Sequence, residues 1–347
     1  MSCDKRFEFM KNTIESRLLV TIFVGISICI YFFFLMLPLP LLRHNPSDEL
    51  NSYCFTKLSL QPFKYNLSTD YGKQLPIFES RPASQFIAGR VWDNCSSVKI
   101  WNNFKFTALS ISFATYNTAW LGLLFGLVIF YCRKHSVLII FGVFSGIMYN
   151  LTLPGRCWIL PWDMPIMCLF TWCIFVFLNR EYFPLLFLVF TASLMKETGL
   201  VCALLVLFGP WSWAKRVPGF IGLIIAFIVC RKFLMTASGA TVILLPLNEA
   251  NSIHGIVSNT FTQIKSNISE TFSFHLNSPF VANCGMLFVM FLLPCNKVVK
   301  LAAGVFMAGQ IIAGTVTEFR DFFEILPLGI MQLSNYLYQD SNTIEKL

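Results

Sequence analysis

Long apolar stretches alternate with short charged segments along most of the chain. Five long windows contain no Asp, Glu, Lys or Arg: 18–42, 106–132, 136–155, 271–296 and 301–317. Five shorter windows of the same kind are 164–179, 182–195, 198–214, 217–230 and 325–339. Because ~20 apolar residues in a helix cross the ~30 Å core of a bilayer, the pattern predicts an all-α, polytopic membrane protein with about ten transmembrane segments. The shorter windows predict spans that are tilted, kinked or paired as half-spans.

The basic residues between these windows predict the orientation of the spans. The first window follows four basic residues, Lys5, Arg6, Lys11 and Arg17. It is too long for a signal peptide and lacks a small-residue cleavage site, so we expect a retained span with residues 1–17 in the cytoplasm. Alternation from there gives the inner side Arg133-Lys134, Arg180, Lys215-Arg216, Lys297 with Lys300, and Lys346, as the positive-inside rule requires. Arg231-Lys232 falls on the outer side and is the exception.

Two hydrophilic stretches, 43–105 and 235–270, are then expected to be outer loops. In the first, Phe86, Ile87 and Val91 can share one face of a helix between Arg81 and Trp92. This pattern predicts an amphipathic helix that lies on the membrane. No shift in composition marks a second domain, so residues 1–347 are expected to form a single membrane domain.

The composition agrees with a membrane protein. Of the 347 residues, 56% are hydrophobic and only 13% are charged, and the mean hydropathy is +0.64. These values exclude an ordinary soluble domain and a nucleic-acid-binding chain. No Cys-x-x-Cys pair, metal-ligand spacing of histidines or phosphate-binding loop is present, so we predict neither a metal nor a firm cofactor.

Four groups of ionisable residues adjoin the apolar windows, and all four fall on the predicted outer side. They are Asp48-Glu49, the segment from Arg156 to Asp163, Lys196-Glu197, and Glu318 with Arg320. Ionisable groups at membrane depth are costly, which makes them candidates for a functional site. One outer cavity that contains these groups would suit transfer from an anionic, lipid-linked donor.

Each group has a candidate role in this chemistry. Asp48 or Glu49 would be the catalytic base, with Asp70 and Glu79 as rivals. Cations would stabilise the departing phosphate, and the candidates are Arg81, Arg156, Lys196 and Arg320. Supporting positions are Asp163, Glu197 and Glu318.

Each group also has a structural interpretation. Asp48-Glu49 can be a solvated loop pair, and Lys196-Glu197 can be an ion pair between two half-spans. Asp163 can cap a helix that continues through Met164 and Pro165. Glu318 and Arg320 can form an ion pair, either within one helix or at the membrane interface, that orients the last segment.

A first span, an outer loop with an Asp-Glu pair and an interfacial helix, then many short spans, together resemble the type C glycosyltransferase superfamily. The resemblance implies a polyprenyl-phosphate-linked sugar as donor and a base or acceptor-positioning role for Asp48-Glu49. The Arg81-Pro82 segment, Trp162-Asp163-x-Pro165, Lys196-Glu197-Thr198 and Glu318-x-Arg320 resemble a pattern in uncharacterised bacterial polytopic proteins. The implied location is the bacterial inner membrane. The sequence lacks the aromatic or basic residues that usually follow the Asp-Glu pair, and we expect no sizeable soluble C-terminal domain after the last apolar window.

Two other functions fit the same pattern. In a transporter or lipid flippase, the charged groups would line a pathway, and the short spans near Lys196 and Pro327 resemble broken helices. In a non-catalytic membrane subunit or assembly factor, the outer loops would bind a protein partner. Membrane lipid is the expected partner of all three, and nucleic acid of none.

Overall fold

The computed structural model describes residues 19, 22–34, 108–132, 163–237, 261–262, 264–266, 269, 296–313, 324–325, 327–329 and 332. Helices and their connections make up this part of the chain, and no strand occurs in it. The all-α fold class is therefore confirmed for the residues that the structure describes. The predicted outer loop 43–105 and its interfacial helix at 81–92 lie outside these residues.

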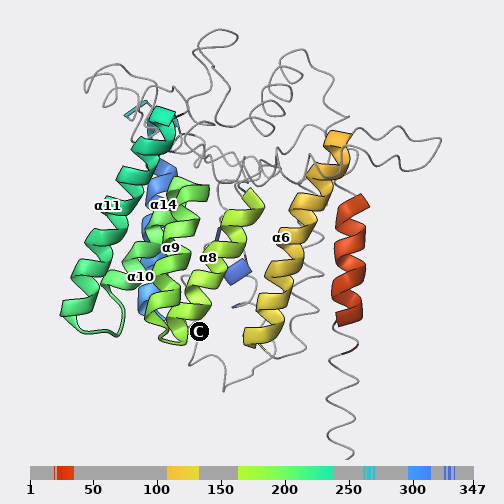
Figure 1. Ribbon diagram of the computed structural model, residues 1–347, viewed down its shortest axis with the longest axis horizontal. Coiled ribbons are helices and arrows are strands. Elements are labelled where there is room, and N and C mark those ends of the chain that lie inside the picture. The colour runs from red at the N-terminus through yellow and green to blue at the C-terminus, as the bar shows by residue number, and fades with distance from the viewer. Residues whose placement is uncertain are drawn as a thin grey trace, which may run out of the picture.

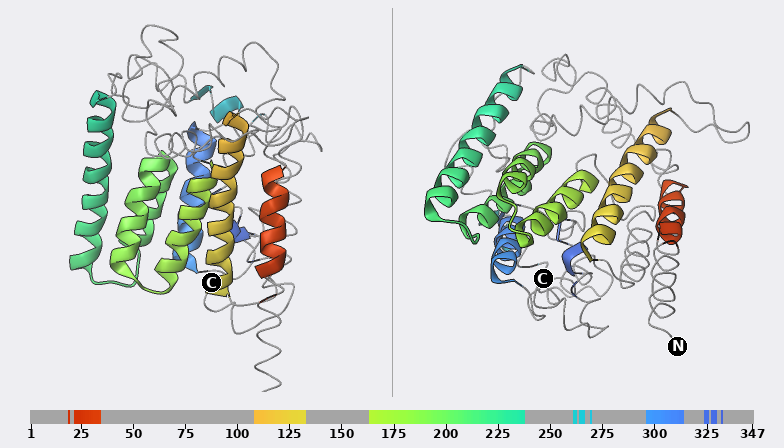
Figure 2. Two further views of the ribbon diagram at one scale, coloured as in Figure 1. Left: turned by 45° about the vertical axis from the view of Figure 1, so that its right-hand side comes forward. Right: turned by 60° about the horizontal axis from the view of Figure 1, so that its bottom comes forward.

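The helices form a bundle in which most of them lie side by side in one row, with α14 behind the row (Figure 1). Their bounds are Ile22–Phe34 for the N-terminal helix, Ala108–Cys132 for α6, Asp163–Leu178 for α8, Tyr182–Met195 for α9, Glu197–Cys202 for the 3-10 helix η1, Ala203–Leu207 for α10, Trp213–Ala237 for α11 and Lys297–Ala313 for α14. The N-terminal helix lies at one edge beside α6, and α11 lies at the opposite edge (Figures 1 and 2). Helix α8 contacts α6 on one side and α9 on the other.

Helix α8 is the centre of the hydrophobic core. Every residue of this helix except Trp172 and Leu178 is buried, which agrees with a sequence that is apolar on all sides. Phe170 of α8 packs edge-to-face against Phe306 of α14, with ring centroids 5.8 Å apart. The core thus extends from α8 in two directions, toward α9 within the row and toward α14 behind it.

Helices α8 and α9 form an antiparallel pair around a tight turn. Arg180 has φ of 60°, and the N–H groups of Arg180 and Glu181 bond to the carbonyls of Phe177 and Val176 at 2.9 and 3.1 Å. This is the Schellman arrangement that closes a helix, here with Arg rather than Gly at the left-handed position. The turn brings the end of α8 next to the start of α9.

Contacts between aromatic rings join this turn to the start of α11. Trp211 packs against Phe177 and Tyr182, with ring centroids 6.1 and 5.2 Å apart. The Tyr182 hydroxyl donates to the carbonyl of Lys215 at 2.5 Å. The basic residues Arg180 and Lys215 therefore lie at the same end of the bundle, which is the lower end in Figure 1.

One helix in the described part is long and apolar enough to cross a membrane, through its window Trp213–Cys230. Only 11% of this window is buried, whereas an apolar core helix of a soluble protein is mostly buried. Shorter apolar helices are Ile22–Phe34, Asp163–Leu178, Tyr182–Met195 and the η1–α10 segment Glu197–Leu207. The described residues thus contain one candidate span rather than the predicted ten, because several apolar windows fall outside them and these helices are shorter than ~20 residues. Helix α11 continues to Ala237, three residues into the second predicted outer loop.

Candidate functional site

The centre of the candidate site is an interruption in the helical chain at Lys196. Helix α9 ends at Met195, and Lys196 has extended backbone angles, with φ of −154° and ψ of 143°. Its N–H still bonds to the carbonyl of Ala192 at 3.0 Å, and its own carbonyl accepts from Gly199 N–H at 2.9 Å. The chain therefore leaves α9 and enters η1 at one extended residue.

Gly199 allows η1 to pack directly on α9. A Cβ atom at this position would overlap the backbone of Ala192 and lie 2.8 Å from the nitrogen of Ser193. Only a residue without a side chain fits such a close approach between two backbones. The glycine of the Lys196-Glu197-Thr198-Gly199 segment thus determines where the polar residues before it are held.

Lys196, Thr198 and Glu324 form a buried polar cluster, called here the Lys196–Glu324 cluster. Lys196 Nζ lies 2.9 Å from Glu324 Oε1, and the two side chains are 5% and 0% exposed. The Thr198 hydroxyl donates to the same Oε1 oxygen at 2.8 Å. The other carboxylate oxygen, Glu324 Oε2, is buried and has no hydrogen-bond partner among the residues that the structure describes. One oxygen of Glu324 is therefore fixed by two donors, and the other remains available as an acceptor.

Two further predicted site residues lie near this end of the α8–α9 pair. Asp163 is the first residue of α8 and is 1% exposed, and Glu197 is half-buried in the first turn of η1. Because α8 and α9 are antiparallel, Asp163 at the start of α8 and Lys196 after the end of α9 lie at the same end of the pair (Figure 1). A carboxylate in the first turn of α8 also interacts favourably with the helix dipole.

The other predicted site residues lie outside the described part of the chain. They are Asp48, Glu49, Asp70, Glu79, Arg81, Arg156, Glu318 and Arg320. The structure thus describes three of the predicted positions, Asp163, Lys196 and Glu197, and adds two that were not predicted, Thr198 and Glu324.

Glu324 has one signal in the sequence that could have identified it. It is the only charged residue between Asp321 and Asp340, and it directly precedes the apolar window 325–339. A lone carboxylate at the edge of an apolar stretch needs a partner, because burial of an unpaired charge is costly. Nothing in the local sequence, however, identifies Lys196 and Thr198 as those partners.

The geometry limits what the cluster can do chemically. Lys196 Nζ already pairs with Glu324 Oε1, so a phosphate that also contacts Lys196 shares the three N–H donors of this ammonium group with the carboxylate. The carboxylate, held at Oε1, can accept a hydrogen bond from a hydroxyl group at Oε2. Within the described ranges, no three His, Cys, Asp or Glu side chains are grouped so that they could hold a metal ion.

No family model matches the chain, and neither a curated protein nor a solved structure matches it.

Proposed function

We propose that the chain is a polytopic membrane protein with its N-terminus in the cytoplasm and about ten spans. The exposed apolar window of α11 supports this proposal, as do the large apolar side chains on the surface of the N-terminal helix, among them Phe23 and Phe34. Exposed apolar surface of this extent is stable in contact with lipid rather than water. Arg180 and Lys215 lie at the same end of the bundle. Because basic residues are enriched on the cytoplasmic side of membrane proteins, this agrees with a cytoplasmic location for that end.

Within this architecture, the function that we propose is transfer of a sugar from a polyprenyl-phosphate donor at the outer membrane face. The observation that carries it is the Lys196–Glu324 cluster. It joins the Lys196-Glu197-Thr198 segment to a carboxylate near the chain's end, and it is buried beside an interrupted helix. Ionisable groups retained at such depth are functional candidates by default, because their burial costs free energy.

The reaction assigns a separate task to each kind of group. An acceptor hydroxyl loses its proton to a carboxylate as its oxygen attacks the anomeric carbon, and the bond from that carbon to the phosphate oxygen breaks. The electron pair of this bond leaves with the polyprenyl phosphate, and a cation stabilises its charge. Asp48 or Glu49 is the proposed base, and Glu324 Oε2 is proposed to accept a hydrogen bond that positions the acceptor.

The test is a transfer assay on the full chain reconstituted in lipid vesicles. A panel of polyprenyl-phosphate hexoses, radiolabelled in the sugar, is supplied together with hydroxyl acceptors, and transfer of the label from the polyprenyl phosphate to the acceptor is measured. We expect Asp48→Asn or Glu49→Gln to abolish turnover through loss of the base, and Glu324→Gln to reduce it about 100-fold through misplacement of the acceptor. The control is Glu181→Gln, which changes an exposed carboxylate at the α8–α9 turn and should leave turnover unchanged.

Thermal unfolding of each variant separates loss of chemistry from loss of folding. Full activity in a folded Glu324→Gln protein would reject a role for that carboxylate. Full activity in both loop variants would reject Asp48 and Glu49 as the base.

A second function, transport of a solute or lipid, is favoured by one specific observation. The extended backbone of Lys196 between α9 and η1 resembles the broken helices at which transporters bind substrates and ions. Lipid scrambling or solute uptake by vesicles that contain the protein, without sugar release, would support transport over transfer.

A further inference from the structure

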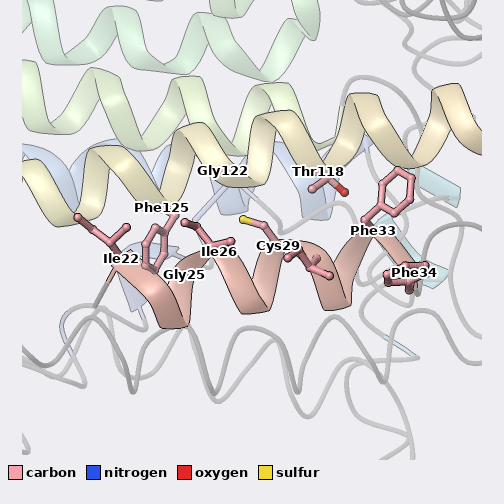
Figure 3. A pocket seen from close by; sticks show the side chains of 10 residues that line it. Ile22, Gly25, Ile26, Cys29, Phe33, Phe34, Thr118, Gly122 and Phe125 are labelled. Carbon is pink, nitrogen blue, oxygen red and sulfur yellow. The ribbon is translucent and has the colours of Figure 1, made fainter. Parts of the chain in front are cut away.

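Two surface features of the described helices have no part in the proposed transfer. The groove between the N-terminal helix and α6 is lined by uncharged side chains, which do not select one apolar occupant over another (Figure 3). The other feature lies where the α8–α9 turn meets the start of α11, at the lower end of the bundle in Figure 1. Its basic and aromatic side chains are Arg180, Phe183, Trp213, Lys215 and Arg216, called here the Arg180–Lys215 surface.

Positive charge is in excess on this surface. Arg180 and Lys215 are exposed, and neither forms an ion pair with a described residue. In the α8–α9 turn and residues 208–216, Glu181 is the only carboxylate beside three basic residues. Because most of the positive charge is not balanced within the protein, the surface attracts anions.

Contacts between the two elements fix the positions of these cations. The Tyr182 hydroxyl, two residues after Arg180, donates to the carbonyl of Lys215 at 2.5 Å. The ring of Tyr182 packs on Trp211, with centroids 5.2 Å apart, and Arg216 Nε donates to the carbonyl of Trp211. The backbone positions of all three basic residues are therefore fixed relative to one another.

Arg180 occupies a backbone position that favours glycine. Its φ of 60° lies in the left-handed region, where the closing residue of a Schellman turn is usually glycine. A larger residue at this position costs free energy, and such strain is commonly retained where a side chain binds a ligand. The turn itself does not require an arginine, which points to a role for the guanidinium group.

The exposed aromatic side chains beside these cations restrict the kind of anion. Phe183 and Trp213 are 75% and 63% exposed, and the Arg216 guanidinium carbon lies 4.7 Å from the centroid of the Trp213 ring. A free phosphate ion would contact the cations and leave both rings uncovered. A phospholipid has a phosphate for the cations and acyl chains for the rings, so it matches both parts of the surface.

We propose that the Arg180–Lys215 surface binds an anionic phospholipid. The headgroup phosphate lies between Arg180 and Lys215, and the acyl chains contact the exposed rings. The proposal rests on the membrane architecture proposed above and not on sugar transfer. The Lys196–Glu324 cluster lies at the other end of α9, a helix of 14 residues or roughly 21 Å, so the two sites are separate.

The test measures binding of phosphatidylglycerol to the full chain in detergent micelles by native mass spectrometry, with zwitterionic phosphatidylcholine for comparison. We expect phosphatidylglycerol to bind about tenfold more tightly. Arg180→Gly and Lys215→Gln should each weaken its binding about fivefold, since each removes one cation beside the phosphate. The matched control is Lys232→Gln, which removes an exposed lysine from the other end of α11 and should leave binding within about twofold.

Arg180→Gly also separates lipid binding from folding. Glycine adopts a φ of 60° without steric cost, so without lipid the variant should unfold at about the same temperature as the parent or higher. Phosphatidylglycerol in excess should then raise the unfolding temperature of the parent more than that of the variant. A purely structural role for Arg180 predicts the same difference between the two proteins with and without lipid.

Several results would overturn the proposal. Equal binding of the two lipids would reject recognition of charge, and unchanged binding in both Arg180→Gly and Lys215→Gln would reject the surface. An equal loss in Lys232→Gln would show diffuse attraction rather than a site. Displacement of phosphatidylglycerol by an equal concentration of inorganic phosphate would identify a general anion site. A chain that stays soluble without detergent would instead contradict the membrane architecture.

Discussion

The Glu324 carboxylate is held by residues that are far away in the sequence. Its Oε1 oxygen accepts from Lys196 and Thr198, and Thr198 lies 126 residues earlier in the sequence. A buried ion pair adds little net stability, because desolvation of both charges offsets their attraction. Removal of one partner is different, since it leaves the other charge buried without compensation.

This asymmetry predicts the effect of Lys196→Met. The variant leaves Glu324 as an uncompensated buried carboxylate, and we expect it to lower the free energy of unfolding by about 3–5 kcal/mol. The double variant Lys196→Met with Glu324→Met replaces the pair by apolar side chains and should recover most of this loss. The measurement is thermal unfolding of the purified protein in detergent. Lys215→Met, which removes an exposed lysine, is the control, and a single-variant loss no larger than that of the control would contradict the prediction.

At the scale of elements, the sequence predicted helix positions better than helix boundaries. The uncharged window 182–195 coincides with α9. The charged residues that bound the window, Glu181 and Lys196, are also the residues that cap the two ends of the helix. The window 217–230 is shorter than α11, because Lys215, Arg216 and Lys232 lie within that helix. Absence of charge therefore marks the apolar part of a helix rather than its full length, since exposed charged side chains are compatible with helix ends.

The break at Lys196 and its pairing with Glu324 were beyond local reasoning. The window 198–214 predicted one short span, whereas the chain forms η1 and α10 and ends the helix at Leu207. The apolar pattern of these residues is the same for a 3-10 helix, an α-helix or a short strand. Lys196-Glu197 was a candidate site because both residues are charged, but the contact between Lys196 and Glu324 is tertiary, and no local pattern encodes it.

The close packing of η1 on α9 predicts the effect of a single methyl group. Gly199→Ala places a Cβ against the backbone of Ala192, so the two elements must separate, and we expect a loss of about 1–3 kcal/mol in unfolding free energy. Gly222→Ala in α11 meets no atom within 4 Å and should stabilise the protein by up to about 1 kcal/mol. Thermal unfolding of both variants in detergent measures this difference. An equal effect of the two substitutions would show that η1 does not require the close approach.

At the scale of the whole molecule, the described helices have one end that is defined by several independent contacts. The α8–α9 turn, Trp211 and the first turn of α11 meet there through the rings of Phe177 and Tyr182. Arg216 also stacks over the ring of Trp213, with its guanidinium carbon 4.7 Å from the ring centroid. Basic and aromatic side chains in one layer are typical of a cytoplasmic membrane interface.

The direction of α11 makes this arrangement testable. From Trp213 to Lys232 the helix rises roughly 28 Å, close to the ~30 Å of a bilayer core, so its two ends should face opposite compartments. We expect single cysteines at Glu181 and Ser212, in a cysteine-depleted background, to be labelled by a membrane-impermeant thiol reagent only after the cells are opened. A cysteine at Lys232 should be labelled in intact cells, although Arg231-Lys232 is the exception to the positive-inside rule. All three positions are exposed, unlike Asp163 and Lys196, so packing within the protein does not block the reagent there. Labelling of all three from the same side would mean that α11 does not cross the membrane, and the proposed outer-face site at Lys196 would lose its topological basis.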